Sequence, residues 1–219
     1  MSNSGRAYPG QTMIVQYDVK RCIHAAECVN GLPAVFDPNR KPWIDPNAAS
    51  ADDIAAIVMR CPTGALHFER IDGGAAEPVP ARNRTTLAVD GPLYLHGEIE
   101  IARMDGTVLL QDTRVALCRC GASQNKPFCD GNHATAGFAD AGQLGANQLK
   151  PVDPAVEAGV LRVTLAPNGP LLVNGPFELC AATGEDCYAS SSGALCRCGA
   201  SQNKPFCDGS HKGIGFTAE

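Results

Sequence analysis

The sequence predicts an α+β protein in which one N-terminal unit is followed by two β-rich modules. A shift of 78 residues lays 84–133 over 162–211 without a gap, and 27 of these 50 positions are identical, so the two modules are a duplication. The residues before the repeat have no counterpart in it. Segments rich in Ala, Gly and Pro, at 72–83 and 139–158, separate the parts. We therefore predict three domains, at residues 1–80, 81–145 and 146–219.

The N-terminal unit is predicted to contain a strand, a helix and a second strand. Residues 15–19 alternate apolar and polar side chains, as a half-buried strand does, and residues 66–71 alternate again. Between them, Ser50 can cap a helix in which Asp53 occupies the capping-box position. The apolar face of this helix would consist of Ile54, Ile57, Val58 and Cys61.

Each repeat copy is predicted to begin with a meander of short strands. In the first copy the apolar runs are 87–89, 93–95 and 99–101. The sequences Asp-Gly-Pro and His-Gly lie between the runs, and both are typical of turns. The runs are too short for helices, so strands are the better interpretation.

The cysteine content is the most informative part of the composition. The chain has 11 cysteines, an odd number that disulfides cannot pair completely. Residues 1–10 lack the basic and apolar stretches of a signal peptide, so we expect a cytoplasmic protein with reduced thiols. Clustered cysteines in a reducing compartment indicate metal binding or redox chemistry.

Charge and hydropathy argue against two classes of partner. The net charge of −5 disfavours nucleic acid, because phosphate contacts need a surplus of Lys and Arg. No apolar stretch in the sequence approaches the roughly 18 residues of a membrane helix, so we expect no membrane partner.

Both repeat copies contain the pattern Cys-x-Cys-x8-Cys-x3-His. Its residues are Cys118, Cys120, Cys129 and His133 in the first copy, and Cys196, Cys198, Cys207 and His211 in the second. Zinc sites usually separate paired cysteines by about two to four residues, and a single intervening residue fits that poorly. It suits two thiolates on one iron of a 2Fe-2S cluster, with the later cysteine and the histidine on the other iron.

The second copy reads Cys-Asp-Gly-Ser-His at 207–211, which resembles the signature of the CDGSH iron–sulfur domain, or NEET, family. The first copy differs only by Asn132 in place of serine. The resemblance covers about half of the chain. It implies a 2Fe-2S cluster with three Cys and one His per module, and two modules that associate. We therefore expect the two modules to form an intramolecular pseudo-dimer, which would favour a monomeric chain.

The histidine ligand has a chemical consequence. Three thiolates and one neutral imidazole leave a cluster less negative than four thiolates would, and a less negative cluster is easier to reduce. Four cations flank the ligands and either balance cluster charge or are solvated surface residues; they are Arg119, Lys126, Arg197 and Lys204.

A further site is predicted from Cys22, Cys28 and Cys61. With Pro62 they reproduce the two ends of the bacterial ferredoxin pattern, in which Ala25 occupies the place of the middle cysteine. Residues 12–71 thus resemble a divergent single-cluster ferredoxin domain. Three thiolates favour a 3Fe-4S cluster. The alternatives are a 4Fe-4S cluster whose fourth iron is held by His24, water or an external thiol, and three cysteines that are merely buried.

Four residues remain outside these donor sets. Cys180 and Cys187 align with Ala102 and Leu109 of the first copy, so we expect small buried apolar residues, with a disulfide or an extra metal as the alternatives. His67 and His96 have no neighbouring cysteine in the sequence and are expected to be ordinary strand or turn residues.

The donor inventory predicts an iron–sulfur protein that transfers electrons to or from a redox partner protein. We expect no enzymatic activity, because the sequence contains no phosphate loop, nucleophile elbow or nucleotide fingerprint. One alternative is cluster transfer to an apo-acceptor protein or redox and iron sensing, since a protonatable histidine makes each cluster labile. A structural zinc protein is the other.

Overall fold

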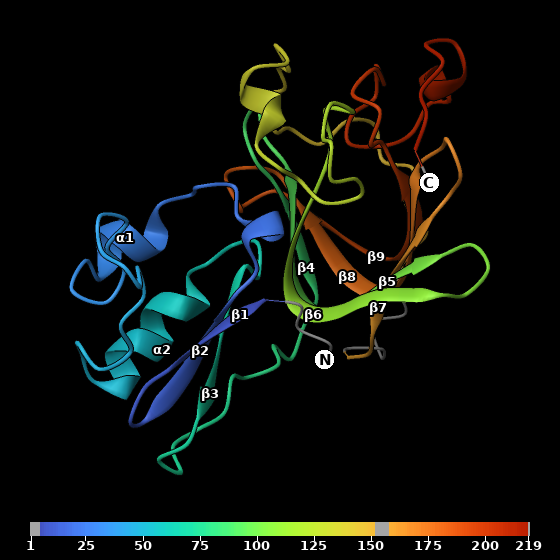
Figure 1. The fold of residues 1–219 in the computed structure, drawn as a ribbon. Coiled ribbons are helices and arrows are strands. Elements are labelled where there is room, and N and C mark those ends of the chain that lie inside the picture. Colours follow the sequence, from blue (N-terminus) through green and yellow to red (C-terminus); the bar gives the residue numbers. More distant parts are fainter. Residues whose placement is uncertain (1–4, 152–157, 219) are drawn as a thin grey trace. The chain divides into compact units, whose positions relative to one another are not determined.

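The computed structural model describes residues 5–151 and 158–218 and divides into two compact units. One unit extends to Pro78 and the other begins at Val79, so both repeat copies lie in the second unit. Among the described residues, the two α-helices belong to the first unit and the second consists mainly of strands (Figure 1). None of the described helices has the length and apolar content that a membrane span requires.

The first unit contains a three-stranded antiparallel sheet. Its strands β1 (Arg6–Pro9), β2 (Met13–Tyr17) and β3 (Leu66–Arg70) pair in the order β1-β2-β3. The predicted strand at 15–19 ends two residues early, because Asp18 caps a short 3-10 helix at Val19–Arg21. The Asp18 carboxylate accepts a hydrogen bond from the Lys20 backbone N–H at 2.9 Å.

The predicted helix is α2 (Ala51–Met59), which packs against β3. The Ser50 hydroxyl accepts a hydrogen bond from the Asp53 N–H at 3.2 Å, which confirms the predicted cap. Ile54 and Val58 are completely buried in the core that the helix forms with the sheet. A shorter helix, α1 (Glu27–Gly31), precedes α2 and carries Cys28.

The second unit contains one six-stranded sheet built by both repeat copies. The first copy supplies β4 (Arg84–Leu87), β5 (Leu93–Arg103) and β6 (Val108–Leu117). The second copy supplies β7 (Leu161–Leu165), β8 (Leu171–Cys180) and β9 (Cys187–Leu195). Within each copy the strands are antiparallel, whereas β4 pairs with β8 and β5 with β7 in parallel. These pairings close a ring through β4, β5, β7 and β8, and one core contains apolar side chains of both copies.

The separate short strands predicted at 93–95 and 99–101 are wrong, because both runs belong to the continuous strand β5. The predicted His-Gly turn is a register shift between His96 and Ile99. Residues before the shift pair with β4, and those after it pair with β7 of the other copy. Gly97 permits this change of partner, because its φ is +152° and a Cβ there would overlap the Asn83 side chain.

Candidate metal centres

The predicted donors of each repeat copy lie on one loop, which follows β6 in the first copy and β9 in the second. Both loops rise from the same end of the sheet (Figure 1). Each ends in a one-turn 3-10 helix, Asn132–Ala134 or Ser210–Lys212, that contains the histidine. The preceding residues, Gly131 and Gly209, have a φ of +88°, which glycine adopts without strain.

The first loop gathers its four donors. The Sγ atoms of Cys118 and Cys120 are 3.7 Å apart, and Cys129 Sγ lies 3.4 Å from His133 Nδ1. Cys120 interacts electrostatically with both His133 and Cys129, so the two pairs lie near each other. Three thiols and one imidazole nitrogen at this spacing can bind a metal or an iron–sulfur cluster.

The second loop repeats this geometry. Cys196 Sγ and Cys198 Sγ are 3.6 Å apart, and Cys207 Sγ lies 3.4 Å from His211 Nδ1. Because the two loops share their sequence and their distances, one kind of site is expected in both.

Backbone N–H groups point at the sulfurs of the first loop. Ala122 N–H donates to Cys120 Sγ and Gly131 N–H donates to Cys129 Sγ, each at 3.4 Å. The hydrogen bond that Cys120 shares with Cys118 and the one from Ala122 lower the pKa of Cys120, whereas burial raises the pKa of Cys129 to about 11. Metal binding at this loop must therefore displace the proton of Cys129.

Two aspartates that the sequence reading did not single out hold the loops in shape. Asp130 accepts hydrogen bonds from the Gln124 N–H at 2.7 Å and the Asn132 N–H at 3.1 Å. Asp208 accepts the equivalent bonds, and a hydrogen bond with the Ser210 side chain together with these backbone bonds holds its pKa well below the usual range. The sequence held a signal for this role, because an aspartate directly follows the third cysteine in both copies.

Arg119 and Arg197 lie between the paired cysteines and are buried, so the surface interpretation of these two cations is wrong. Arg119 donates to the carbonyls of Gly91 (2.9 Å) and Ala88 and pairs with Asp140 at 2.8 Å. Arg197 donates to Gly169 O at 2.8 Å and to Ala166 O at 2.7 Å. Each guanidinium fastens its ligand loop to the turn between the first two strands of its own copy.

The lysines have a smaller structural part. Lys126 Nζ donates to Ser123 O and Lys204 Nζ to Ser201 O, both at 2.7 Å, so each lysine closes its own loop.

The two ligand loops touch each other. Cys120 and Cys198 form an antiparallel β-bridge. Gly121 and Gly199 lie against this bridge, and a Cβ on either would come within 2.6 Å of the opposite cysteine's carbonyl oxygen. One ligand of each site is thus held by direct contact with a ligand of the other.

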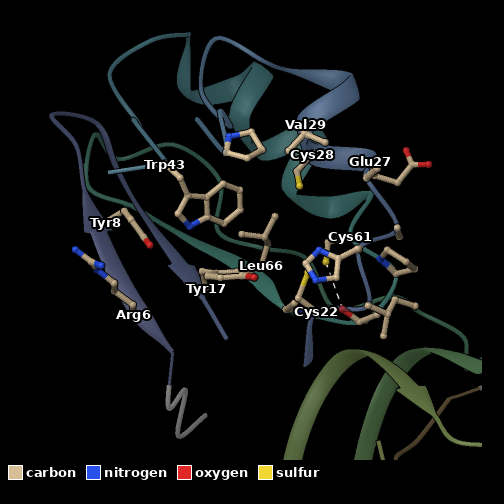
Figure 2. A pocket seen from close by; sticks show the side chains of 18 of the residues that line it. Arg6, Tyr8, Tyr17, Cys22, Glu27, Cys28, Val29, Trp43, Cys61 and Leu66 are labelled. Atoms are coloured by element: carbon tan, nitrogen blue, oxygen red, sulfur yellow. Dashed lines mark hydrogen bonds between the residues drawn. The ribbon is translucent and has the colours of Figure 1, made fainter. Parts of the chain in front are cut away.

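The N-terminal cysteines also converge. Cys22, Cys28 and Cys61 line a cavity of about 740 Å³ in the first unit. In Figure 2 the Cys28 sulfur points into the cavity that Cys22 and Cys61 also line. Burial raises the pKa of Cys28, and the charges of Cys61 and Cys22 raise it further. The three predicted donors are therefore placed for a common ligand, and the hypothesis of three unrelated buried cysteines loses its support.

The rest of the cavity is aromatic and strained. The Tyr17 and Trp43 rings pack edge to face with centroids 4.8 Å apart, and burial and a hydrogen bond with Cys22 raise the pKa of Tyr17. His24 and Ala26 line the wall with positive φ values of 58° and 61°, which are uncommon for residues other than glycine. This strained backbone forms the segment between Cys22 and Cys28, as is common at functional sites.

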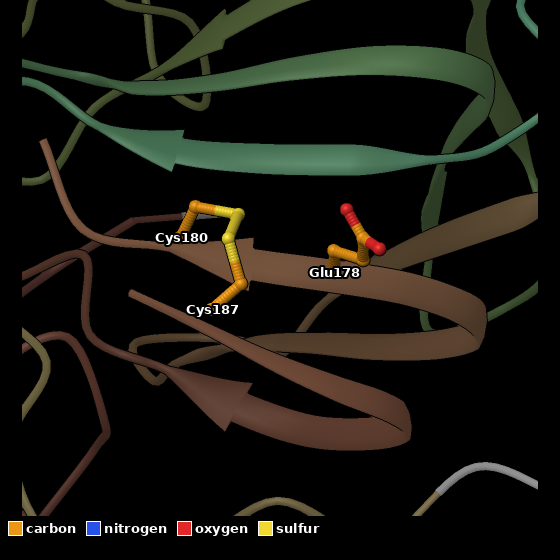
Figure 3. Close-up of side chains that lie close together, drawn as sticks. All are labelled: Glu178, Cys180 and Cys187. Carbon is orange, nitrogen blue, oxygen red and sulfur yellow. A yellow bond between two sulfur atoms is a disulfide. The ribbon is translucent and has the colours of Figure 1, made fainter. Parts of the chain in front are cut away.

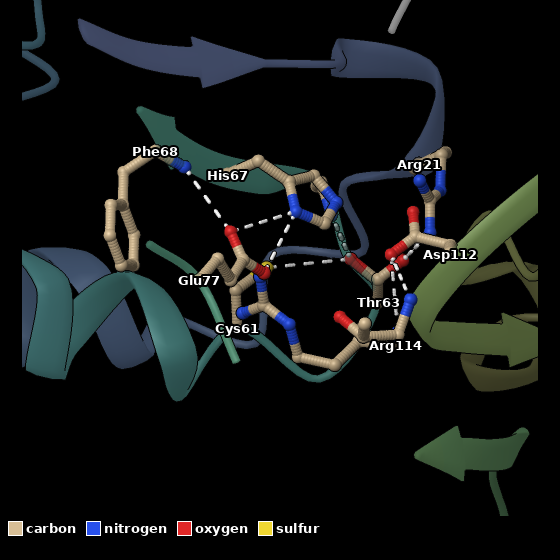
Figure 4. A network of polar contacts seen from close by, with 10 residues as sticks. Arg21, Cys61, Thr63, His67, Phe68, Glu77, Asp112 and Arg114 are labelled. Atoms are coloured by element: carbon tan, nitrogen blue, oxygen red, sulfur yellow. Dashed lines mark hydrogen bonds and ion pairs between the residues drawn. The ribbon is translucent and has the colours of Figure 1, made fainter. Parts of the chain in front are cut away.

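His67 is not part of these sites. Its Nδ1 lies 2.9 Å from a Glu77 carboxylate oxygen, as Figure 4 shows, so it has a structural ion-pair partner. His96 lies within β5. Both are the strand residues that the sequence predicted.

The expectation of two small buried thiols at 180 and 187 is wrong, because Cys180 and Cys187 form a disulfide. They are directly opposite each other on β8 and β9. Cys180 is buried, whereas Cys187 is exposed. The signal was available in the sequence: two cysteines seven positions apart flank a turn that contains Gly184.

Comparisons with known proteins match separate parts of the chain to two families. Residues 8–70 match the family described as "Divergent 4Fe-4S mono-cluster". Residues 90–134 and 168–212 each match the family described as "Iron-binding zinc finger CDGSH type". The chain is also similar to "Uncharacterized protein YjdI" of Escherichia coli strain K12, with 33% identity over 63 residues, or 29% of this chain and 83% of that protein. The O157:H7 protein of the same name matches equally.

No solved structure matches the chain. The matched regions contain all eleven predicted donors. The chain therefore belongs to the CDGSH iron-binding family, with two such domains in tandem after an N-terminal divergent 4Fe-4S mono-cluster domain.

Proposed function

We propose that this chain is a multi-cluster iron–sulfur protein that transfers electrons to or from a redox partner protein, and that it is a carrier rather than an enzyme. One observation carries the proposal: nine cysteines and two histidines converge as three separate donor sets. When bound, iron–sulfur clusters supply one-electron redox chemistry. The chain's own residues supply the ligands, fix their spacing and donate N–H groups to the sulfurs.

The two loop sites fit 2Fe-2S clusters. Each offers two cysteine sulfurs less than 4 Å apart and a cysteine–histidine pair, a donor set for two irons. The N–H groups of Ala122 and Gly131 offset negative charge on the ligand sulfurs. The imidazole leaves the site less negative than a fourth thiolate would, which favours the reduced state.

The N-terminal site fits a cluster held by three thiolates. We infer a 3Fe-4S cluster, in which each iron needs one protein donor. The second candidate is a 4Fe-4S cluster, which the description of the matching family favours. His24 lines the cavity, so its imidazole is a protein group of the right chemistry for a fourth iron.

The two CDGSH domains form an intramolecular pseudo-dimer in this proposal. The exchange of partners supports it: β4 of the first copy pairs with β8, and β7 of the second copy makes the equivalent pairing with β5. The bridge between Cys120 and Cys198 supports it as well, since it joins the same residue of both copies. Such an arrangement would favour a monomer.

An anaerobic redox titration, followed by visible absorption and EPR, tests electron transfer. We expect reversible reduction of the purified protein. His133→Cys should lower the midpoint potential of one 2Fe-2S cluster by on the order of 100 mV, because the added thiolate makes that cluster more negative. His211→Cys should do the same to the other cluster. Asn132→Ser is the control, since it only gives the first loop the residue of the second; irreversible bleaching of the wild type on reduction would contradict the proposal.

Cluster donation is the second candidate function. The observation that favours it is the partial exposure of His133 and His211 at the edges of their loops. It predicts that replacing both histidines by cysteine slows transfer to an apo-acceptor protein, because thiolate is the firmer ligand. Unchanged transfer rates, together with the potential shifts described above, would favour the electron carrier.

The fourth ligand is tested by His24→Ala. If the cluster is 3Fe-4S, the oxidised protein gives a low-temperature EPR signal from a paramagnetic centre, and the variant should leave both the signal and the iron content unchanged. If His24 holds a fourth iron, the oxidised wild type is silent and the variant should gain the signal as it loses about one iron. Iron analysis and EPR of the same samples check both outcomes.

A further inference from the structure

The disulfide in the second CDGSH domain lies outside all three donor sets. Cys180 ends β8 and Cys187 begins β9, and the turn between them is closed by hydrogen bonds within residues 181–186. Figure 3 shows the two sulfurs bonded across the strands, with Glu178 farther along β8. Glu178 and the two cysteines place their donor atoms within 4.8 Å of one another. While the sulfurs are bonded to each other, their thiolates are not available to a metal, so the chemistry of this group is that of a disulfide.

The two sulfurs differ in access. Cys187 is exposed, so an external thiolate can approach the disulfide from the side of this residue. Cys180 is completely buried and is the sulfur that would leave. Exchange is faster when the attacked sulfur is accessible and the leaving thiolate is stabilised.

Arg84 supplies that stabilisation. Its Nε lies 3.3 Å from Cys180 Sγ, and its terminal nitrogen Nη2 lies 3.6 Å from Cys187 Sγ. The same nitrogen donates to Gly184 O, which fixes the guanidinium against the turn. The Glu178 carboxylate opposes this effect, but the guanidinium makes the direct hydrogen bond to the buried sulfur. A cation in contact with a sulfur lowers the pKa of the corresponding thiol and so favours the thiolate.

The duplication provides an internal comparison. The counterpart of Arg84 is Arg162, which pairs with Glu100 at 2.6 Å. Glu100 is itself the counterpart of Glu178. Where the first copy has Ala102 in place of a cysteine, Arg162 binds the Glu100 carboxylate. Where the second copy has the two sulfurs, Arg84 binds the sulfurs.

We propose that Cys180 and Cys187 are a redox site that exchanges two electrons with dithiols, in addition to the iron–sulfur sites. A thiolate of the dithiol attacks Cys187 Sγ, the Cys180–Cys187 bond breaks, and its electron pair passes to Cys180 as a thiolate beside Arg84. The second thiolate of the dithiol then attacks the dithiol sulfur that is bonded to Cys187, and this step releases the Cys187 thiolate. The dithiol becomes a disulfide, the protein gains two electrons, and the two protons of the dithiol pass to the protein thiols or to solvent.

The test uses the complete, cluster-containing protein, incubated anaerobically with reduced and oxidised dithiothreitol in defined ratios. Differential alkylation and mass spectrometry of the peptide with both residues measure the fraction reduced. We expect one two-electron transition, with the circular dichroism and the visible absorption of the clusters unchanged. Two free thiols at every ratio, or reduction only when the protein unfolds, would overturn the proposal.

The role of Arg84 is tested by the rate of reduction. Arg84→Gln should slow reduction about tenfold, because the leaving thiolate loses its cation. Arg84→Lys keeps the charge and should retain most of the rate, which separates electrostatics from any loss of folding. Arg162→Gln is the matched control, because Arg162 pairs with Glu100 of the first copy and not with the disulfide, and it should leave the rate unchanged. Equal rates for Arg84→Gln and Arg162→Gln would show that the guanidinium does not act on the sulfurs and would overturn this assignment.

Discussion

Replacing Gly121 by alanine should destabilise the second unit by about 3 kcal/mol and reduce cluster binding at both loops. The new Cβ would lie 2.6 Å from the Cys198 carbonyl oxygen and 3.0 Å from its carbonyl carbon, which are backbone atoms that cannot rotate away. Gly121 also has a φ of +78°, which strains an L-residue. Because Cys198 is a predicted ligand of the other loop, a substitution in the first loop should disturb the second.

Gly137→Ala is the matched control for this prediction. Gly137 has a φ of +65°, but a Cβ there meets nothing within 4 Å, so the variant should cost only about 1 kcal/mol of backbone strain. Thermal unfolding and the iron content of both variants measure the difference. Equal destabilisation, or iron loss at the first loop alone, would show that the contact between the loops does not hold the ligands.

Replacing Arg119 by methionine should destabilise the second unit by about 3–5 kcal/mol. The guanidinium makes hydrogen bonds to two carbonyls and a salt bridge to Asp140, and both side chains are largely buried, with 3% and 10% exposed. Methionine fills much of the space but leaves the Asp140 carboxylate without this charge partner in a poorly solvated place. The Phe138 ring, 5.3 Å from the guanidinium carbon, would lose its cation as well.

Arg119→Lys separates charge from geometry. Lysine keeps the positive charge near Asp140 but lacks the planar guanidinium, whose separate nitrogens donate to Gly91 O and Ala88 O together. It should therefore recover only part of the stability. Denaturant unfolding of the wild type and of both variants measures the three stabilities, which should fall from the wild type to Arg119→Lys to Arg119→Met. A methionine variant as stable as the wild type would mean that the Arg119 guanidinium does not hold the ligand loop to the turn.

Local patterns made the ligand loops and α2 predictable from the sequence. The donors lie within sixteen residues of each other, so their spacing alone constrains the site, and the duplication shows the pattern twice. The α2 cap depends on Ser50 and Asp53, which are three residues apart, and it forms as expected. Features set by neighbours in sequence were therefore predicted correctly.

Features that depend on pairing between residues far apart in the sequence were not predicted correctly. The His96-Gly97 sequence is typical of a turn, yet β5 continues through it, because its two halves pair with different strands and β7 begins more than sixty residues later. Arg119 looks like a surface cation until its partners at 88, 91 and 140 are known. The Cys180–Cys187 disulfide depends on the register of β8 and β9, which the alignment with apolar residues of the first copy concealed.

The central claim is that three donor sets hold three iron–sulfur clusters. Iron, zinc and acid-labile sulfide, measured per chain in anaerobically purified protein, test it most directly. Two 2Fe-2S clusters and one 3Fe-4S cluster predict about seven irons and about eight sulfides, and a 4Fe-4S cluster at the N-terminal site raises the iron to about eight. About three zinc ions per chain with no sulfide would contradict the account, because the same donors would then be structural zinc sites.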